Sequence, residues 1–218
     1  MSKGSPERTT EQQNCTQPTR SGEDVVESQC DLENSASAPI SSQAPTATDI
    51  VQPAPVGEYD LSGKIKDGLR RHAKAVVVIT CRYDGQRYAM AATAACELSL
   101  DPPSMLVCVN KSASIHSPLT KGADFCVNIL HSSHQTIAAM CSGKVKGEAR
   151  FQEGNWAEDE RLTPYLGDAQ ASFFCSLDGS FSYGTHDVFI GSIHHARTNG
   201  PVDPLVYVNG SYAPLAQS

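Results

Sequence analysis

The first 57 residues contain no phenylalanine, tyrosine or tryptophan. Ser, Thr, Gln, Glu, Pro and Ala dominate this stretch, and such a composition cannot bury enough apolar surface to offset the entropy lost on ordering. The sequence therefore predicts a disordered low-complexity tail over residues 1–57 and one folded domain over residues 58–218. The tail also lacks the basic start and apolar run of a signal peptide, and it is too acidic for a transit peptide.

Long apolar runs are missing as well, because no stretch approaches the roughly 20 residues needed to cross a bilayer, so we expect no membrane segment. None of the eight cysteines forms a Cys-x-x-Cys pair, and several lie in apolar runs, where a thiol behaves as a small hydrophobe. This cysteine usage favours a reducing, cytoplasmic compartment. The sequence also predicts no metal site. The cysteines lack the spacing of a zinc site, and the adjacent His194 and His195 have no carboxylate or thiol at ligand spacing.

A surplus of basic residues is also lacking. The formal net charge is −7, and residues 1–57 carry −5 of it, with eight acids against three bases. A nearly neutral domain behind an acidic tail argues against nucleic acid as the main partner.

Short apolar runs rich in β-branched residues predict many strands and few helices. Two dipeptides typical of hairpin turns, Asp-Gly at residues 84–85 and Asn-Gly at residues 209–210, separate pairs of these runs. This pattern favours a mainly β fold, an antiparallel barrel that is closed or nearly closed, with a few short helices. Strands are expected at residues 75–82, 88–93, 104–110, 125–130, 188–193, 205–208 and 211–213, and helices at residues 63–72, 116–119 and 134–140.

Two regions of the folded part are less clearly defined by the sequence. Residues 169–182 predict either one long strand or a hairpin that turns at Asp178 and Gly179. Residues 143–168 are polar and loop-rich, with Arg150 and Trp156 embedded in them.

The stretch that carries most chemistry spans residues 91–116. A strand of small residues begins at Ala91, and Asp101, Pro102 and Pro103 then form a turn, because each proline fixes φ and removes a donor. An apolar strand follows, and after it a polar loop offers hydroxyls, backbone N–H groups and cations. Small side chains admit a planar ring, and a loop rich in donors holds a phosphate. This layout suits a flavin nucleotide.

These motifs, taken in order, resemble the short-chain flavin reductase family, the reductase components of two-component flavin-dependent monooxygenases. The resemblance covers about residues 64–215. Each motif is weak alone, but the ordered set is specific. The motifs are residues 89–95, 99–103, 107–116, 125–130, 150–151, 184–191 and 204–207, the last followed by Gly210 and Tyr212.

The resemblance implies a split β-barrel that binds FMN or FAD, usually as a homodimer. It implies that NADH or NADPH reduces the flavin, which then passes to a separate flavin-dependent monooxygenase. It also implies that His186 lies beside the nicotinamide and positions it. The flavin-binding residues that it implies are Ala91, Ala92, Thr93, Ala94, Cys96, Cys108, Asn110, Lys111, Ser112, Ser114, His116, Arg150 and Tyr212.

Two departures from the family pattern weigh on function. Ala95 and Cys96 stand where the family often has two serines, so hydroxyls that could bond flavin are lost. Thr185 stands where the family has an acid, so the partner that could orient His186 is lost or displaced to Asp187. These departures favour an alternative, a flavin-binding barrel without reductase turnover or an oxidase of the pyridoxamine-phosphate type. No Gly-x-Gly-x-x-Gly motif opens a helix after a strand, which disfavours a classical dinucleotide fold.

Several residues remain open between a binding role and an ordinary one. The polar loop is either a phosphate site or a solvated strand end. Arg150 faces the flavin phosphate, the dinucleotide or solvent, and His116 either closes the loop or starts the helix. His186 lies beside the nicotinamide or on a surface turn, while Trp156 and Tyr212 cover the cofactor or only pack.

Overall fold

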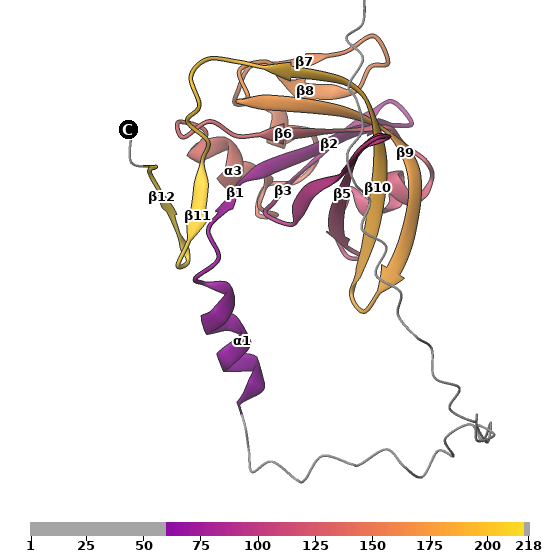
Figure 1. Ribbon diagram of the computed structural model, residues 1–218. Coiled ribbons are helices and arrows are strands. Elements are labelled where there is room, and N and C mark those ends of the chain that lie inside the picture. Colours follow the sequence, from indigo (N-terminus) through magenta and orange to yellow (C-terminus); the bar gives the residue numbers. More distant parts are fainter. Residues whose placement is uncertain (1–59, 216–218) are drawn as a thin grey trace, which may run out of the picture. The chain divides into compact units, whose positions relative to one another are not determined.

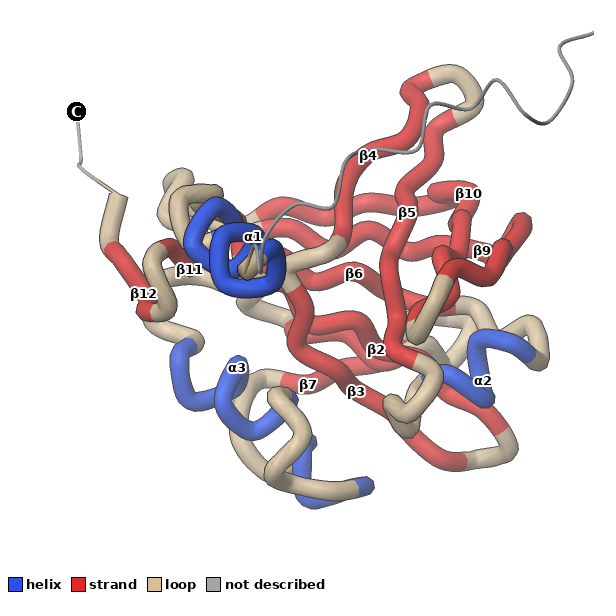
Figure 2. The backbone as a smooth tube through the Cα atoms, turned by 90° about the horizontal axis from the view of Figure 1, so that it is seen from below, coloured by secondary structure: helices blue, strands red, loops and turns tan. Residues whose placement is uncertain are grey.

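The computed structural model describes residues 60–215, so the predicted disordered tail lies outside the described residues. Seven antiparallel strands form the main sheet in the order β3-β2-β6-β9-β10-β5-β4, and the sheet curls into a split barrel (Figure 1, Figure 2). Its strands are β2 (Val77–Tyr83), β3 (Gln86–Ala92), β4 (Ala95–Leu100), β5 (Pro103–Asn110), β6 (Phe125–Ile129), β9 (Ala171–Tyr183) and β10 (His186–Thr198).

Smaller elements surround this sheet. A three-stranded sheet has the order β1-β11-β12, and a two-stranded sheet pairs β7 with β8. None of the helices in residues 60–215 is long and apolar enough to cross a membrane. The bounds are β1 (Lys74–Ala75), β7 (Trp156–Glu158), β8 (Pro164–Leu166), β11 (Val206–Val208), β12 (Ser211–Ala213), α1 (Leu61–Leu69), α2 (His116–Thr120), α3 (Gln135–Cys141) and the 3-10 helix η1 (Gly147–Phe151).

The core has two parts, one on each face of β2. Successive side chains of a strand point to opposite faces. Ile79 therefore packs in the barrel interior with Val107 and Phe125, while Val78 packs outside it with Leu130 and the helix α3. Burial on both faces explains why β2 has an almost uninterrupted apolar sequence.

Both predicted dipeptide turns are present, and their backbone angles explain the residues used. Asp84 and Gly85 have φ of 49° and 73°, and Asn209 and Gly210 have φ of 50° and 80°. Such left-handed pairs match the twist of a two-residue hairpin and favour Asn-Gly and Asp-Gly. The first hairpin joins β2 to β3, and the second joins β11 to β12.

The alternative hairpin at Asp178 and Gly179 is wrong, because β9 runs unbroken through both residues. Gly179 pairs with Ile190 while Leu177 pairs with Gly191, so Asp178 is the extra residue of a β-bulge. A bulge and a tight turn both favour such residues. The chain reverses later, at Gly184, and His186 is therefore the first residue of β10 rather than a loop residue.

The small-residue stretch also divides differently from the prediction. Strand β3 ends at Ala92 and β4 starts at Ala95, so Thr93 and Ala94 form the break between the two ends of the sheet. The Ala94 carbonyl accepts a hydrogen bond from the Cys108 N–H at 2.9 Å, which ties the break to β5. The region 143–168, expected as loop, contains η1, β7 and β8.

Candidate functional site

A cleft of about 400 Å³ opens beside β3, where the loop after β5 meets the segment that joins α3 to η1. Its floor includes Ala91, and its polar lining includes Ser112, Ser114, Lys146 and Arg150. We call this hollow the anion cleft. It gathers four of the predicted flavin-binding residues from three separate parts of the chain.

Arg150 is fixed in the wall of the anion cleft with only 6% of its surface exposed. Its Nε donates to the Val145 carbonyl at 2.8 Å, and its Nη1 donates to the Ala89 carbonyl and, at 3.1 Å, to the Ser114 hydroxyl. Within residues 60–215, its Nη2 forms no hydrogen bond. A buried guanidinium that is anchored on one side and has an unused N–H edge fits a phosphate group.

The polar loop is held in shape by Asn110 at the end of β5. Its Oδ1 accepts from both the N–H and the hydroxyl of Ser112, each at 2.8 Å, and its carbonyl accepts from the Ala113 N–H at 2.9 Å. This turn is the local structure that asparagine favours. Asn110 therefore positions the serines and does not line the anion cleft itself.

A second cleft, of about 340 Å³, continues along β3 and shares Ala91 and Ser142 with the anion cleft. Its lining includes Ala92 and Thr93, with Tyr212 on β12. We call it the ring cleft, because small side chains leave room for a planar ring against the strand. Burial raises the pKa of Tyr212, and neighbouring Tyr207 adds to this effect, so its hydroxyl stays protonated as a hydrogen-bond donor.

Lys111 and His116, both predicted to bind the flavin, line neither cleft. His116 Nε2 lies 2.7 Å from Asp187 Oδ2, and Lys111 Nζ lies 3.6 Å from Asp187 Oδ1. Lys111 Nζ also donates to the Gly184 carbonyl at 2.9 Å. The Ser182 hydroxyl and the His116 ring lower the pKa of the Asp187 carboxyl, and Lys111 contributes, so Asp187 is an anion that holds the polar loop to the β9–β10 hairpin.

His186 lies at the same hairpin, paired with Asn110 across β5 and β10. Its ring is exposed, and its Nδ1 lies 2.9 Å from the Thr185 hydroxyl. The displaced acid does not orient it, because Asp187 faces His116 on the other side of the strand. The threonine at the position of the family acid thus supplies the partner of His186.

The remaining predicted residues lie on the neighbouring strands. Cys96 on β4 is exposed, and Cys108 on β5 is half-buried. Both lie on the face of the sheet opposite to buried Val107. Trp156 packs edge-on against Phe151 at 5.0 Å and donates its Nε1–H to the Glu153 carbonyl, so it supports η1 and lines neither cleft.

Among the lining residues that were missed from the sequence are two polar ones from the segment after α3, Ser142 and Lys146. The signal was present, because Gly143 and Gly147 bracket two lysines just before Arg150. Both glycines have positive φ, 106° and 54°. They bend the segment around the anion cleft, a role that the loop-rich composition alone does not reveal. Among residues 60–215, no three His, Cys, Asp or Glu side chains are grouped to hold a metal ion.

A split barrel with a phosphate-fitting cleft beside a strand of small residues defines the class of flavin-binding split-barrel proteins. The family model "Flavin reductase like domain" matches residues 69–216. The chain therefore belongs to the flavin reductase-like family of oxidoreductases, as the sequence motifs predicted.

The names of similar proteins agree with this membership. The chain is 33% identical over 153 residues to FMN reductase (NADH) RutF 1 of Methylorubrum extorquens, covering 70% of this chain and 76% of the relative. It is 38% identical over 146 residues to the reductase component of FADH(2)-dependent resorcinol hydroxylase from a Rhizobium strain, covering 66% and 82%. The fold is similar to BorF, the flavin reductase component of a bacterial two-component tryptophan halogenase, with a TM-score of 0.66 and 29% identity over 72% of this chain and 99% of BorF.

Proposed function

We propose that this protein reduces FMN or FAD with a hydride from NADH or NADPH and supplies the reduced flavin to a partner monooxygenase. The observation that carries the proposal is the anion cleft, which Arg150 lines together with Ser112 and Ser114 and in which, within residues 60–215, the Nη2 of Arg150 has no hydrogen bond. The relatives support the reaction, because one is named an NADH-dependent FMN reductase and another the reductase component of a hydroxylase.

In this proposal the flavin phosphate lies in the anion cleft, bound by Ser112, Ser114 and Arg150, with Lys146 adding charge. The planar ring lies over Ala91, Ala92 and Thr93 in the ring cleft, with Tyr212 at its side. When bound, the flavin supplies the acceptor of the hydride, and this chemistry is the cofactor's own. The protein contributes binding and orientation.

The other predicted contacts stay proposals with narrower roles. Asn110, Lys111 and His116 act as positioning residues for the polar loop, through the hydrogen bonds at Ser112, Gly184 and Asp187. Ala94, Cys96 and Cys108 are proposed to border the flavin from β4 and β5. His186 is proposed to hydrogen-bond the nicotinamide, with its ring orientation set by Thr185.

We also propose that two copies associate. Helix α1 buries no residue within the part of the chain that the structure describes, and it stands away from the sheet (Figure 1). Its Leu61, Ile65 and Leu69 are 57%, 50% and 59% exposed. Apolar side chains this exposed on one helix favour burial against another surface. Light scattering on the full chain tests this, and a monomer mass at all concentrations would contradict it.

The reaction is tested by following NADH and NADPH oxidation with FMN, with FAD and without added flavin. We expect flavin-dependent oxidation of at least one nucleotide. The matched variant is Arg150→Gln, which removes one of the two positive charges that line the anion cleft and should raise the FMN concentration required for oxidation. Tight flavin binding without oxidation of either nucleotide would replace this proposal with the alternative of a flavin-binding protein lacking turnover.

A further inference from the structure

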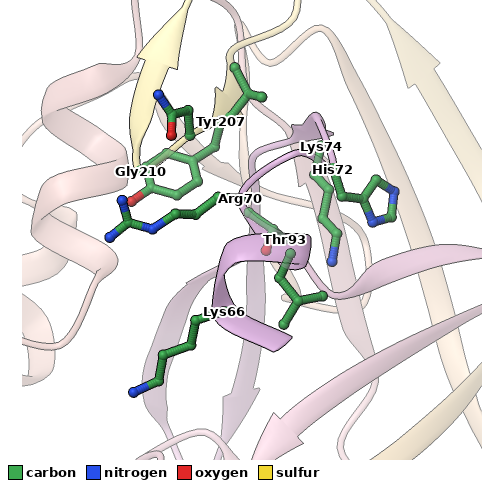
Figure 3. A pocket seen from close by; sticks show the side chains of 10 residues that line it. Lys66, Arg70, His72, Lys74, Thr93, Tyr207 and Gly210 are labelled. Atoms are coloured by element: carbon green, nitrogen blue, oxygen red, sulfur yellow. The ribbon is translucent and has the colours of Figure 1, made fainter. Parts of the chain in front are cut away.

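A third hollow, of about 400 Å³, lies between α1, β1 and the β11–β12 turn, and cations dominate its charged lining. Lys66, Arg70 and Lys74 line it together with His72, and no aspartate or glutamate does so (Figure 3). We call it the basic pocket. Its charge is local, because the whole chain carries a net charge of −7.

Backbone bonds hold the walls of the basic pocket together. The Asn209 N–H in the β11–β12 turn donates to the Arg70 carbonyl at 2.7 Å, and Lys74 pairs with Tyr207 between β1 and β11. The walls of the basic pocket are therefore formed by the first described helix and the last hairpin, which these backbone contacts connect. These contacts fix the backbone positions of Arg70 and Lys74 relative to each other.

Its cations are not used elsewhere in the described part of the chain. Within residues 60–215, none of Lys66, Arg70 and Lys74 forms an ion pair. The α1 dipole favours cations at the helix C-terminus, which accounts for Lys66 and Arg70 but not for Lys74 on β1. The charged ends of Lys66, Arg70 and Lys74 point in different directions (Figure 3), but all three side chains line one concave site, and cations around such a site create a positive potential that attracts anions.

The basic pocket is continuous with the two clefts already described. It shares Thr93 and Tyr207 with the ring cleft, and the ring cleft shares Ala91 with the anion cleft. The anion cleft, the ring cleft and the basic pocket thus lie one after another along β3 and Thr93, the residue that follows it. A ring over this strand has one cationic site at each end, and the flavin phosphate occupies only one of them in the proposed function.

We propose that the basic pocket binds the phosphate groups of the reduced nicotinamide dinucleotide while its hydride-donating end reaches the ring cleft. This inference rests on the proposed function and names the binding subsite of the hydride donor. The ligand chemistry is a nucleotide phosphate, either the 5′-diphosphate common to NADH and NADPH or the 2′-phosphate of NADPH alone. The diphosphate of FAD is the competing source.

Calorimetric titration of the full chain tests the pocket without any turnover. The probes are adenosine 5′-diphosphate, adenosine 2′,5′-bisphosphate and adenosine. We expect at least one phosphorylated probe to bind and adenosine to bind far more weakly. The double variant Arg70→Gln with Lys74→Gln should weaken that binding on the order of tenfold or more, because it removes two charged donors. Preference between the two phosphorylated probes identifies the phosphate that the pocket takes.

The control is Arg71→Gln, which removes one positive charge at the residue next to Arg70, whereas the double variant removes two. Arg71 donates to the Asp67 carbonyl and does not line the pocket, so probe binding should change little. Equal weakening in the control and the double variant would overturn the inference, because the effect would then be general electrostatics. Absence of probe binding in the wild-type chain would overturn it as well.

Kinetics then separate the two nucleotide sources and the two proposals. The double variant should raise KM for NADH or NADPH and leave kcat/KM unchanged for 1-benzyl-1,4-dihydronicotinamide, a hydride donor without phosphate. A rise in KM for FAD alone would assign the pocket to the flavin and overturn the donor assignment. If the wild-type chain oxidises no nucleotide, the proposed function fails, while the calorimetric result still decides the pocket.

Discussion

Replacing Arg150 with lysine should weaken FMN binding and leave riboflavin binding almost unchanged. Lysine keeps the charge but not the planar fork that reaches the Val145 and Ala89 carbonyls, the Ser114 hydroxyl and a phosphate together. A hydrogen bond between charged groups contributes roughly 1.5–3 kcal/mol, which corresponds to roughly a 10- to 150-fold rise in the Kd of FMN. Quenching of flavin fluorescence on binding measures both affinities.

Two controls decide how this result is interpreted. Riboflavin has the same ring and no phosphate, so equal losses for both ligands would refute phosphate contact at Arg150. Lys111→Ala removes a cation from the same neighbourhood, but its ammonium faces Gly184 and Asp187, so we expect a smaller loss of FMN affinity. A loss with Lys111→Ala that exceeds the loss with Arg150→Lys would show that the flavin phosphate lies outside the anion cleft. Circular dichroism confirms that each variant is folded.

Three further predictions concern other parts of the structure. His186→Ala should lower NADH-dependent kcat/KM by about tenfold, or about 1.4 kcal/mol, with flavin affinity unchanged, and unaltered stopped-flow kinetics would return His186 to a surface role. Asp187→Asn should destabilise the fold at neutral pH. The pKa of Asp187 is lower in the folded protein than in the unfolded chain, where it is roughly 3.9. The carboxylate therefore contributes to the free energy of unfolding above the unfolded pKa, and this contribution is lost as the pH falls through the folded pKa. The free energies of unfolding in urea of the wild type and the variant should therefore become equal in acid. Gly191→Ala should cost about 1–3 kcal/mol in thermal unfolding, because its Cβ would lie 2.5 Å from Phe125 Cζ, whereas Gly179→Ala, with open space, serves as the control.

Local signals in the sequence predicted the turns and the buried strands. Asp84 with Gly85 and Asn209 with Gly210 form hairpins because their left-handed backbone is a property of two residues. Asp178 with Gly179 presents the same signal and forms a bulge, because the long pairing of β9 with β10 outweighs a turn there. Whether such a dipeptide forms a turn or a bulge depends on the partner strand, and the periodicity of the sequence does not show which strands pair.

The sequence named some of the residues that line the two clefts, but it did not show how they are arranged. Ser114 and Arg150 meet only because the chain from α3 to η1 folds back against the polar loop, 36 residues later in the sequence. The direction of Lys111 depends on the Gly184 carbonyl in the β9–β10 hairpin, and the sequence left the strand before this turn open between one long strand and a hairpin at Asp178 and Gly179. Arg70 and Lys74 acquire a pocket only when the last hairpin closes beside them.

Strand β3 is an edge of the main sheet, and this position has a consequence for handling the protein. An uncovered sheet edge can pair with the edge of another molecule and lead to aggregation. Its small residues, which leave room for a ring, also leave little bulk to obstruct such pairing, while η1 and α3 contact part of the strand and Arg150 donates to the Ala89 carbonyl. A nucleotide in the clefts along β3 would therefore act as a shield. Protein prepared with abundant flavin should stay monodisperse at concentrations where flavin-free protein precipitates.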